Sequence, residues 1–398
     1  MTVSASAGDA MLRVSEKLRD FPENWSWGRL EDLCKGIYDC PHSTPRIITT
    51  GPYVVRTQDI LTGVFLIDSA AHVSEETYRE RTMRAVPGRG DLLYSREGTY
   101  FGIAAEVPSG VRVCLGQRMV LIRPDEEVMD FRFLRYWLNS PVMAAYIHGF
   151  RDGSVAERLN LPTIRSLPVL MPPVGEQSAI AGVLNALDDK IAVNDRTAGA
   201  ADSLLRAHFS AISRNAEREV KLGDLIQLKY GKALREEDRS PGRIPVFGGN
   251  GISGWNNIPL DGGPGIIVGR KGANAGSVSW SQGPFWAIDT SFYVEPIAPK
   301  IPLEFLFFLL EDAGLRNLVG DSAIPGLNRE IALSCTVRLP AENVVHLLAE
   351  TARPLLALNA QIAEESRTLA ELRDTLLPKL MSGEIRVPDA EKVVEDVT

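Results

Sequence analysis

The 398-residue sequence has no long apolar segment and only four cysteines. No uninterrupted apolar run approaches the roughly 18 residues that a membrane-spanning helix needs. The longest candidate, residues 301–310, is interrupted by Pro302 and Glu304. The first twenty residues lack the apolar core of a secretory signal, and the cysteines have no pairing rhythm, which suits a reducing compartment. The sequence therefore predicts a cytoplasmic protein without a membrane partner.

Catalytic signatures are also absent. There is no Walker GxxxxGK[ST] string, so ATP use by this chain is not expected. The Asn-Pro-Pro-Tyr/Phe string of an amino-methyltransferase is missing too. GGNGISG places Gly249, Gly251 and Gly254 in a GxGxxG pattern, but the following residues 255–259 (WNNIP) cannot open the helix that a dinucleotide site requires. We interpret this segment as a turn and expect no bound cofactor.

Metal and nuclease sites have little support. Cys34, Cys40 and His42 lie close in sequence, but their spacing matches no zinc pattern and a fourth ligand is missing. Small buried cysteines are the usual alternative. Asp188-Asp189-Lys190 resembles a fragment of a nuclease signature, yet it falls within a predicted helix, where a solvated charged face is typical. The sequence predicts a chain that is not an enzyme and holds no metal.

The composition is that of a globular protein, with 44% hydrophobic and 24% charged residues. The chain is long enough for two or three domains. Its net charge of −8 argues against strong DNA binding by the chain as a whole. The acidity is uneven, however, because residues 22–160 carry 16 basic and 18 acidic side chains while four acids fall in the last ten positions. Alone, the chain should bind DNA modestly, or need a more basic partner.

The chain contains an internal repeat. Four short strings recur in the same order, at offsets that fall from 192 to 168 residues as loops change length. The pairs are Leu30-Glu31-Asp32-Leu33 with Leu222-Gly223-Asp224-Leu225, Arg96-Glu97-Gly98 and Gly102 with Arg270-Lys271-Gly272 and Gly276, Phe133-Leu134 with Phe305-Leu306, and Gly153-Ser154 to Leu159-Asn160 with Asp321-Ser322 to Leu327-Asn328. Four matches in register predict two copies of one unit.

Each copy ends in a predicted long helix. Apolar positions step by four and three residues over 180–212 and again over 348–376, which is the period of a coiled-coil seam. Asn194 and Glu365 fall at the same seam position in the two copies, and His208 also lies on the first seam. Pro354 should kink the second helix or move its start.

The region before each helix has mixed character. Residues 111–124 and 265–270 are typical of strands, and residues 131–138 and 303–310 of short helices. Gly and Pro turns separate these segments. The sequence predicts an α+β protein in which two globular mixed α/β domains are separated by two long coiled-coil helices, related by an internal pseudo-twofold repeat.

A glycine-rich segment, Arg-x-Gly-x-x-x-Gly, occurs in both copies. A predicted strand leads into it, and it carries Arg96 in the first copy and Arg270 with Lys271 in the second. Glycines permit positive φ and close backbone approach, and arginine can contact phosphate or the guanine edge. A hairpin with a solvated arginine remains the structural alternative. The duplication favours a protein that reads two half-sites.

Residues near these segments complete the set of candidate DNA contacts. Because they differ between the copies, the two copies could read different sequences. The full set is Arg96, Thr99, Tyr100, Gln117, Arg118, Arg151 and Arg158 in the first copy, and Lys229, Lys232, Arg270, Lys271, Asn274 and Trp280 in the second, with Arg151, Arg158, Lys229 and Lys232 as candidates for phosphate.

The chain resembles a specificity subunit of a type I restriction-modification system over residues 22–387. The resemblance rests on the repeated strings, on Pro172-Pro173 with Glu176-Gln177, on LNALDDKI, and on the closing string LRDTLLPKLMSGEIRV. Two features depart from the family pattern. Residues 339–344 (LPAENV) replace the expected Pro-Pro-x-x-Glu-Gln in the second copy, and the first copy lacks the Ile-Pro-Gly triplet.

The resemblance implies a domain organisation. Residues 1–21 would be an N-terminal extension and residues 388–398 an acidic tail. Between them, the expected segments are target-recognition domains at 22–160 and 219–330, each followed by a conserved helical spacer, at 161–218 and 331–387. The two long helices would pack antiparallel, and the two domains would read a bipartite double-stranded DNA target.

The resemblance also implies partners. Two methyltransferase subunits would supply S-adenosylmethionine and the adenine-methylating site, and restriction subunits would supply ATP- and Mg-dependent translocation and cleavage. A protein-interaction clamp with two lobes is the alternative from a different class, since it would also explain the acidity and the helices. A nuclease with an unrecognised site is a further alternative.

Overall fold

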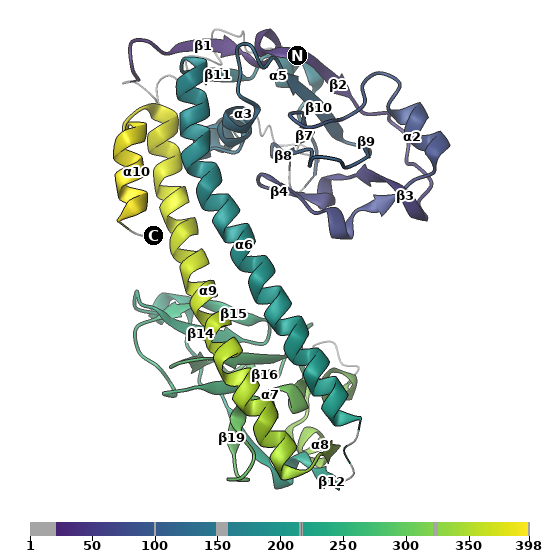
Figure 1. Cartoon of the computed structure of the whole chain (residues 1–398), viewed down its shortest axis with the longest axis vertical. Coiled ribbons are helices and arrows are strands. Elements are labelled where there is room, and N and C mark those ends of the chain that lie inside the picture. Colours follow the sequence, from purple (N-terminus) through teal and green to yellow (C-terminus); the bar gives the residue numbers. More distant parts are fainter. Residues whose placement is uncertain are drawn as a thin grey trace. The chain divides into compact units, whose positions relative to one another are not determined.

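The computed structural model describes residues 21–98, 101–148, 158–214, 216, 218–320 and 325–396. The chain divides into two compact units, residues 1–191 with 368–398 and residues 192–367. Each unit contains one globular copy together with part of two long helices, α6 (Val174–Ser213) and α9 (Glu342–Ser382) (Figure 1). In the described parts of the chain, no helix carries an apolar stretch long enough to cross a membrane.

A four-stranded antiparallel sheet forms the centre of the first copy. Its order is β2 (Cys34–Asp39), β10 (Met119–Pro124), β7 (Leu92–Ser95) and β8 (Ala104–Glu106). Alternate side chains of a strand point to opposite faces. Val120 and Ile122 therefore pack on the side of helix α3 (Phe131–Leu138), while Met119 and Leu121 face a second cluster. Both faces of the sheet are buried, which explains why β10 is almost continuously apolar.

A smaller sheet covers that second cluster. Strand β3 (Ile48–Val55) pairs antiparallel with β6 (Ala71–His72) and parallel with β9 (Val113–Leu115). Beside it lie the hairpin of β4 (Ile60–Leu61) and β5 (Val64–Phe65) and helix α2 (Glu75–Arg81). The segment expected to form strand over 111–124 is thus two strands, β9 and β10, in two different sheets.

The second copy repeats this topology. Its main sheet has the order β13 (Ile226–Tyr230), β19 (Ser291–Pro296), β16 (Gly265–Gly269) and β17 (Val278–Ser281). The smaller sheet contains β14 (Ile244–Gly248), paired antiparallel with β15 (Gly251–Asn256) and parallel with β18 (Trp286–Ala287). Helix α7 (Leu303–Asp312) takes the place of α3. The structure confirms the predicted repeat, the strand expected over 265–270 and the short helices expected over 131–138 and 303–310. The segment GGNGISG contains the turn of the hairpin formed by β14 and β15.

Each copy is closed by a pair of strands that are distant in sequence. The first pair is β1 (Ser26–Arg29) with β11 (Pro168–Met171), and the second is β12 (Arg218–Lys221) with β22 (Thr336–Leu339). A short helix precedes each closing strand, α5 (Leu161–Arg165) or α8 (Arg329–Ser334), and an asparagine side chain caps each one, Asn160 or Asn328. The start of each predicted spacer, up to the end of β11 or β22, therefore belongs to the globular copy, where it forms a two-stranded sheet of its own.

The long helices α6 and α9 pack against each other in an antiparallel sense. In the first unit, Leu184 and Leu187 of α6 share a core with Leu369 and Leu376 of α9. In the second unit, residues 205 and 209 of α6 share a core with residues 348–356 of α9. Residue numbers therefore increase along α6 in the direction in which they decrease along α9. Helix packing of this kind was expected.

The two polar seam residues meet each other. The side-chain amide of Asn194, only 4% exposed, donates to Glu365 Oε2 at 2.8 Å and to Ser366 Oγ at 3.2 Å. The prediction that Asn194 and Glu365 occupy the seam is therefore confirmed. A satisfied polar pair inside an apolar seam favours one register of the two helices.

The expected 3.5-residue seam is wrong at the helix ends that pack on the second copy. His208, assigned to the seam, is exposed, and Phe209 is buried instead at 4%. Leu358 is 39% exposed, whereas Leu356 is buried. The reason is that these turns face a broad globular surface, which follows the 3.6-residue period of a straight helix. Pro354 does not move the start of α9, because the helix runs through it.

The acidic C-terminal segment forms helix α10 (Val387–Glu395). Its Ala390 is fully buried in the core of the first unit, and Val387 and Val394 pack against that core. Arg386, just before the helix, donates from Nη1 to Glu176 Oε1 at 2.7 Å. Net charge alone predicts an acidic tail over residues 388–398. Instead, the apolar side chains of Val387, Ala390 and Val394, at helical spacing, pack this segment against the core of the first unit.

The start of α6 is fixed by a buried glutamine that the second copy lacks. Gln177 is 1% exposed; its Nε2 donates to the carbonyls of Pro172 at 2.8 Å and Val128 at 3.1 Å, and its Oε1 accepts the Asp130 N–H at 2.9 Å. The string 339–344 aligns Val344 with Gln177, but in the structure the equivalent residue on α9 is Val345, because Gln177 N donates to the Pro173 carbonyl as Val345 N donates to the Ala341 carbonyl. Val345 is also 1% exposed. There the residue before α7 is Pro302, which has no N–H to satisfy. The departure of residues 339–344 from the family pattern therefore accompanies the absence of this buried glutamine from the second copy.

Replacing Gln177 by valine should lower the free energy of unfolding by roughly 2 kcal/mol, because it leaves the Asp130 N–H and two carbonyls without their partner. Gln361→Val, at an exposed position of α9, is the matched control and should change stability by less than about 0.5 kcal/mol. Chemical denaturation of the full chain measures both. Equal effects of the two substitutions would contradict this account.

Candidate nucleic-acid interface

The glycines of the two glycine-rich segments adopt matching backbone conformations. Gly98 and Gly102 have φ of 99° and 81°, and Gly272 and Gly276 have 98° and 80°. Gly102 N donates to the Ser95 carbonyl at 2.6 Å, and Gly276 N donates to the Gly269 carbonyl at 2.8 Å. Only glycine adopts these φ values readily. The spacing of the glycines therefore encodes one turn, used twice.

A second repeated string is attached to this turn. The Leu159 N–H donates to the Arg96 carbonyl at 2.8 Å, and the Leu327 N–H donates to the Arg270 carbonyl at 2.9 Å. The turn and the Leu-Asn string thus recur together because they form one structural element. Their upstream partners at 153–154 and 321–322 lie outside the described residues.

The leading candidate of the first copy is buried. The Arg96 side chain is 4% exposed, and its Nη1 lies 3.2 Å from Asp39 Oδ1. The carboxylate of Asp39 also lies 3.4 Å from His42 Nε2. Arg96 therefore holds the base of the turn, and its guanidinium is not presented at the surface.

Other candidates of the first copy gather around Glu97. Arg118 Nε lies 3.4 Å from Glu97 Oε1, and Arg158 Nε lies 4.0 Å from Glu97 Oε2, while both arginine side chains are 55% exposed. Arg118 adopts a φ of 68°, which turns the chain between β9 and β10. Gln117 Nε2 donates to the His42 carbonyl at 3.2 Å. Thr99, Tyr100 and Arg151 lie outside the described residues.

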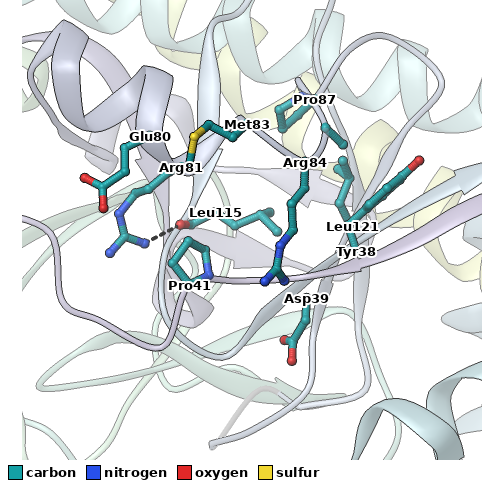
Figure 2. Close-up of a pocket in the computed structure, with 11 residues that line it drawn as sticks. Tyr38, Asp39, Pro41, Glu80, Arg81, Met83, Arg84, Pro87, Leu115 and Leu121 are labelled. Atoms are coloured by element: carbon teal, nitrogen blue, oxygen red, sulfur yellow. Dashed lines mark hydrogen bonds between the residues drawn. The ribbon is translucent and has the colours of Figure 1, made fainter.

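A cleft of about 190 Å³ lies next to Asp39, the partner of Arg96. Asp39 contributes to its wall, as do Tyr38, Met83 and Leu115. Figure 2 shows the Arg84 side chain extending across it toward Asp39. Arg81, a second arginine of the cleft wall, is buried, and its Nη1 donates to the Leu115 carbonyl at 2.8 Å. No repeated or glycine-rich pattern in the sequence points to Arg81, the last residue of α2, or to Arg84, which follows that helix.

The candidates of the second copy are more exposed. Lys232, Lys271 and Asn274 are at the surface, and Arg270 is partly exposed. The Arg270 guanidinium donates from Nη1 to the Asp289 carbonyl at 3.0 Å. Two further candidates have protein partners. Lys229 Nζ lies 3.0 Å from Glu295 Oε2, and the Trp280 ring centroid lies 5.7 Å from that of Phe307 in α7.

The cysteines show no arrangement that would hold a metal ion. Cys34 begins β2 and Cys40 follows its end, so about 20 Å of extended strand separates them. Burial raises the pKa of the Cys34 thiol to about 12 and that of Cys114 to about 11, so both stay protonated at neutral pH. Across the described residues, no group of three possible metal-ligating side chains occurs.

The chain is similar to known proteins in sequence and in fold. The family model described as the type I restriction modification DNA specificity domain matches residues 22–198 and again residues 216–365. A crystal structure of the type I restriction-modification S subunit from M. genitalium superposes with a TM-score of 0.62 at 18% identity, covering 90% of this chain and 96% of that chain. The two matched segments coincide with the two copies.

Curated relatives are similar over parts of the chain. A putative type I specificity subunit of Mycoplasma genitalium is 24% identical over 277 residues, which are 63% of this chain and 71% of that protein. The specificity subunit of the type I restriction enzyme EcoprrI of Escherichia coli is 30% identical over 111 residues. That match spans 27% of this chain and 27% of the E. coli protein.

Replacing Asp39 by asparagine should destabilise the fold by roughly 3 kcal/mol, because the buried charge of Arg96 loses its carboxylate partner. Asp68→Asn, at an exposed position of the same unit, should cost less than about 0.5 kcal/mol. Replacing both members of the buried pair, as in Arg96→Met with Asp39→Asn, should recover much of the loss. Thermal or chemical unfolding distinguishes the variants, and an Asp39→Asn variant as stable as the control would refute the buried pair.

Proposed function

Because the chain belongs to the type I restriction-modification DNA specificity family, we propose that it reads a bipartite double-stranded DNA target, one part with each globular copy. The observation that carries this proposal is the turn found twice in one conformation, with different exposed side chains around it in each copy. A conserved scaffold with divergent surface residues suits recognition of two different half-sites. Specificity subunits are the non-catalytic members of type I complexes.

In this proposal, residues 22–160 and 219–330 are the target-recognition domains. Residues 161–218 and 331–387 contain the helices that separate them. A rigid protein with two recognition domains contacts major grooves that lie on one side of the duplex, about one helical turn or a multiple of it apart. The helices would then set the number of base pairs between the half-sites.

The exposed polar residues near each turn are the proposed DNA contacts. In the first copy these are Gln117, Arg118 and Arg158, and in the second Lys232, Arg270, Lys271 and Asn274. Thr99, Tyr100 and Arg151 remain candidates on sequence grounds. Lys229 would have to leave Glu295 to reach a phosphate, and the buried Arg96 is assigned to support of the turn.

The proposed partners follow from the family. Two methyltransferase subunits would bind the helical regions and bring S-adenosylmethionine, and they would flip the target adenine out of the stack to modify it. Restriction subunits would contribute ATP- and Mg-dependent steps. The net charge of −8 of this chain is consistent with DNA held jointly with more basic partners.

The protein-interaction clamp is the second candidate function. The net charge of −8 favours it over a strong DNA binder. Salt-dependent binding of duplex DNA separates the two, because a clamp for proteins alone has no phosphates to neutralise.

Modified-base sequencing tests the proposed function. The chain is expressed with the methyltransferase subunit proposed as its partner, in cells that lack other adenine methylation. We expect methylated adenines in both parts of a two-part motif, because each globular copy would select one part. The control culture expresses the methyltransferase without this chain and should show no such motif. Co-purification of the two proteins without any motif methylation would favour the clamp.

A further inference from the structure

The repeated arginine has opposite environments in the two copies. Arg96 is ion-paired with Asp39, at the end of β2. Strand β13 is equivalent to β2. Asp39 pairs with Val120 of β10, and Tyr230 pairs with Phe292 at the equivalent position of β19, so Tyr230 stands in the place of Asp39. The second copy therefore has no carboxylate at the position that neutralises Arg96. Arg270 is only partly buried and donates to a backbone carbonyl instead.

Without that carboxylate, the Arg270 guanidinium lies over an aromatic ring. Its Cζ is 4.7 Å from the centroid of the Tyr230 ring and 5.7 Å from that of Phe292. Tyr230 is 50% exposed, so one part of its ring stays accessible from solvent. Cation–π contact orients a guanidinium without neutralising it. Arg270 thus retains its full charge at the surface.

A second guanidinium faces the same tyrosine. Arg329, the first residue of α8, places its Cζ 5.2 Å from the Tyr230 centroid, and its side chain is 40% exposed. Its ion pair with Glu330 joins two neighbouring surface residues at 3.0 Å, a type of contact that contributes little. Two like charges held at one ring repel each other, and an anion between them would relieve the repulsion. The exposed Lys271 and Lys232 add positive charge nearby.

We propose that Tyr230, Arg270 and Arg329, here termed the Tyr230 cluster, bind the phosphate backbone of DNA in the second recognition domain. Arg96 is instead a positioning residue that keeps the equivalent turn of the first domain in shape. This proposal rests on the proposed function. It adds that the two domains hold the backbone with different residues, although they share one fold. It also identifies Tyr230 and Arg329 as functional residues outside the repeated strings.

The salt dependence of DNA binding tests the cluster. The full chain and its Arg270→Ala, Arg329→Ala and double variants are titrated by fluorescence anisotropy with two duplexes of unrelated sequence and equal length. Each lost phosphate contact should reduce the slope of log affinity against log salt by about 0.9, equivalent to about fivefold weaker binding at 0.15 M salt. The double variant should lose about twice that slope. Because phosphates carry no sequence, both duplexes should respond alike.

Two controls make the test specific. Arg338→Ala removes an arginine that is more exposed than Arg329, at 68%, and is paired with Glu219 on β12, and it should leave the slope unchanged. The pair of unrelated duplexes is the second control. A fall in slope with Arg338→Ala would overturn the assignment, and so would an effect of Arg270→Ala confined to one duplex, which indicates base contact.

The outcome also separates this proposal from the proposed function. If the wild-type chain binds both duplexes with a salt-dependent affinity and the cluster variants keep the wild-type slope, the Tyr230 cluster is wrong while DNA recognition stands. If the wild-type chain shows no salt-dependent binding to either duplex, alone or with its methyltransferase subunits, the proposed function fails, and the cluster fails with it.

Discussion

Each globular copy is completed by the long helix that follows the other copy. In the first unit, Leu369, Leu376 and Leu380 of α9 are buried in the core built by residues 25–187. In the second unit, Leu205 and Phe209 of α6 are buried in the core built by residues 222–356. A helix of this length gains most of its stability from an apolar face that packs. Neither copy can therefore keep a complete core without the long helix that follows the other copy.

This dependence separates stability from recognition. The packed core, the strands that close each copy and the Asn194–Glu365 contact tolerate little change, because each buried group has a defined partner. The turn glycines belong to the same constant part. The exposed side chains around them are not needed by the core. They can differ between copies at little cost in stability.

The sequence was sufficient for the repeat, the strands and the helix pair, since glycine spacing and apolar periodicity are local signals. It was insufficient for the environment of Arg96, whose partner Asp39 lies 57 residues earlier in the chain. Phe209 replaced His208 at the helix end because a broad globular face imposes its own period. Helix α10 was hidden by its acidic composition, and Arg81 and Arg84 by the absence of any pattern. Contacts between distant residues decided every one of these differences.

In the proposed function, each copy reads its own half of the target. The most direct measurement replaces residues 219–330 with a second copy of residues 22–160 and maps the methylated motif by modified-base sequencing, beside the wild-type chain. The account predicts that both parts of the new motif carry the half-site that the first copy reads in the wild type. A motif that still contains the original second half-site would contradict it, because that half would then be read by something other than the exchanged domain.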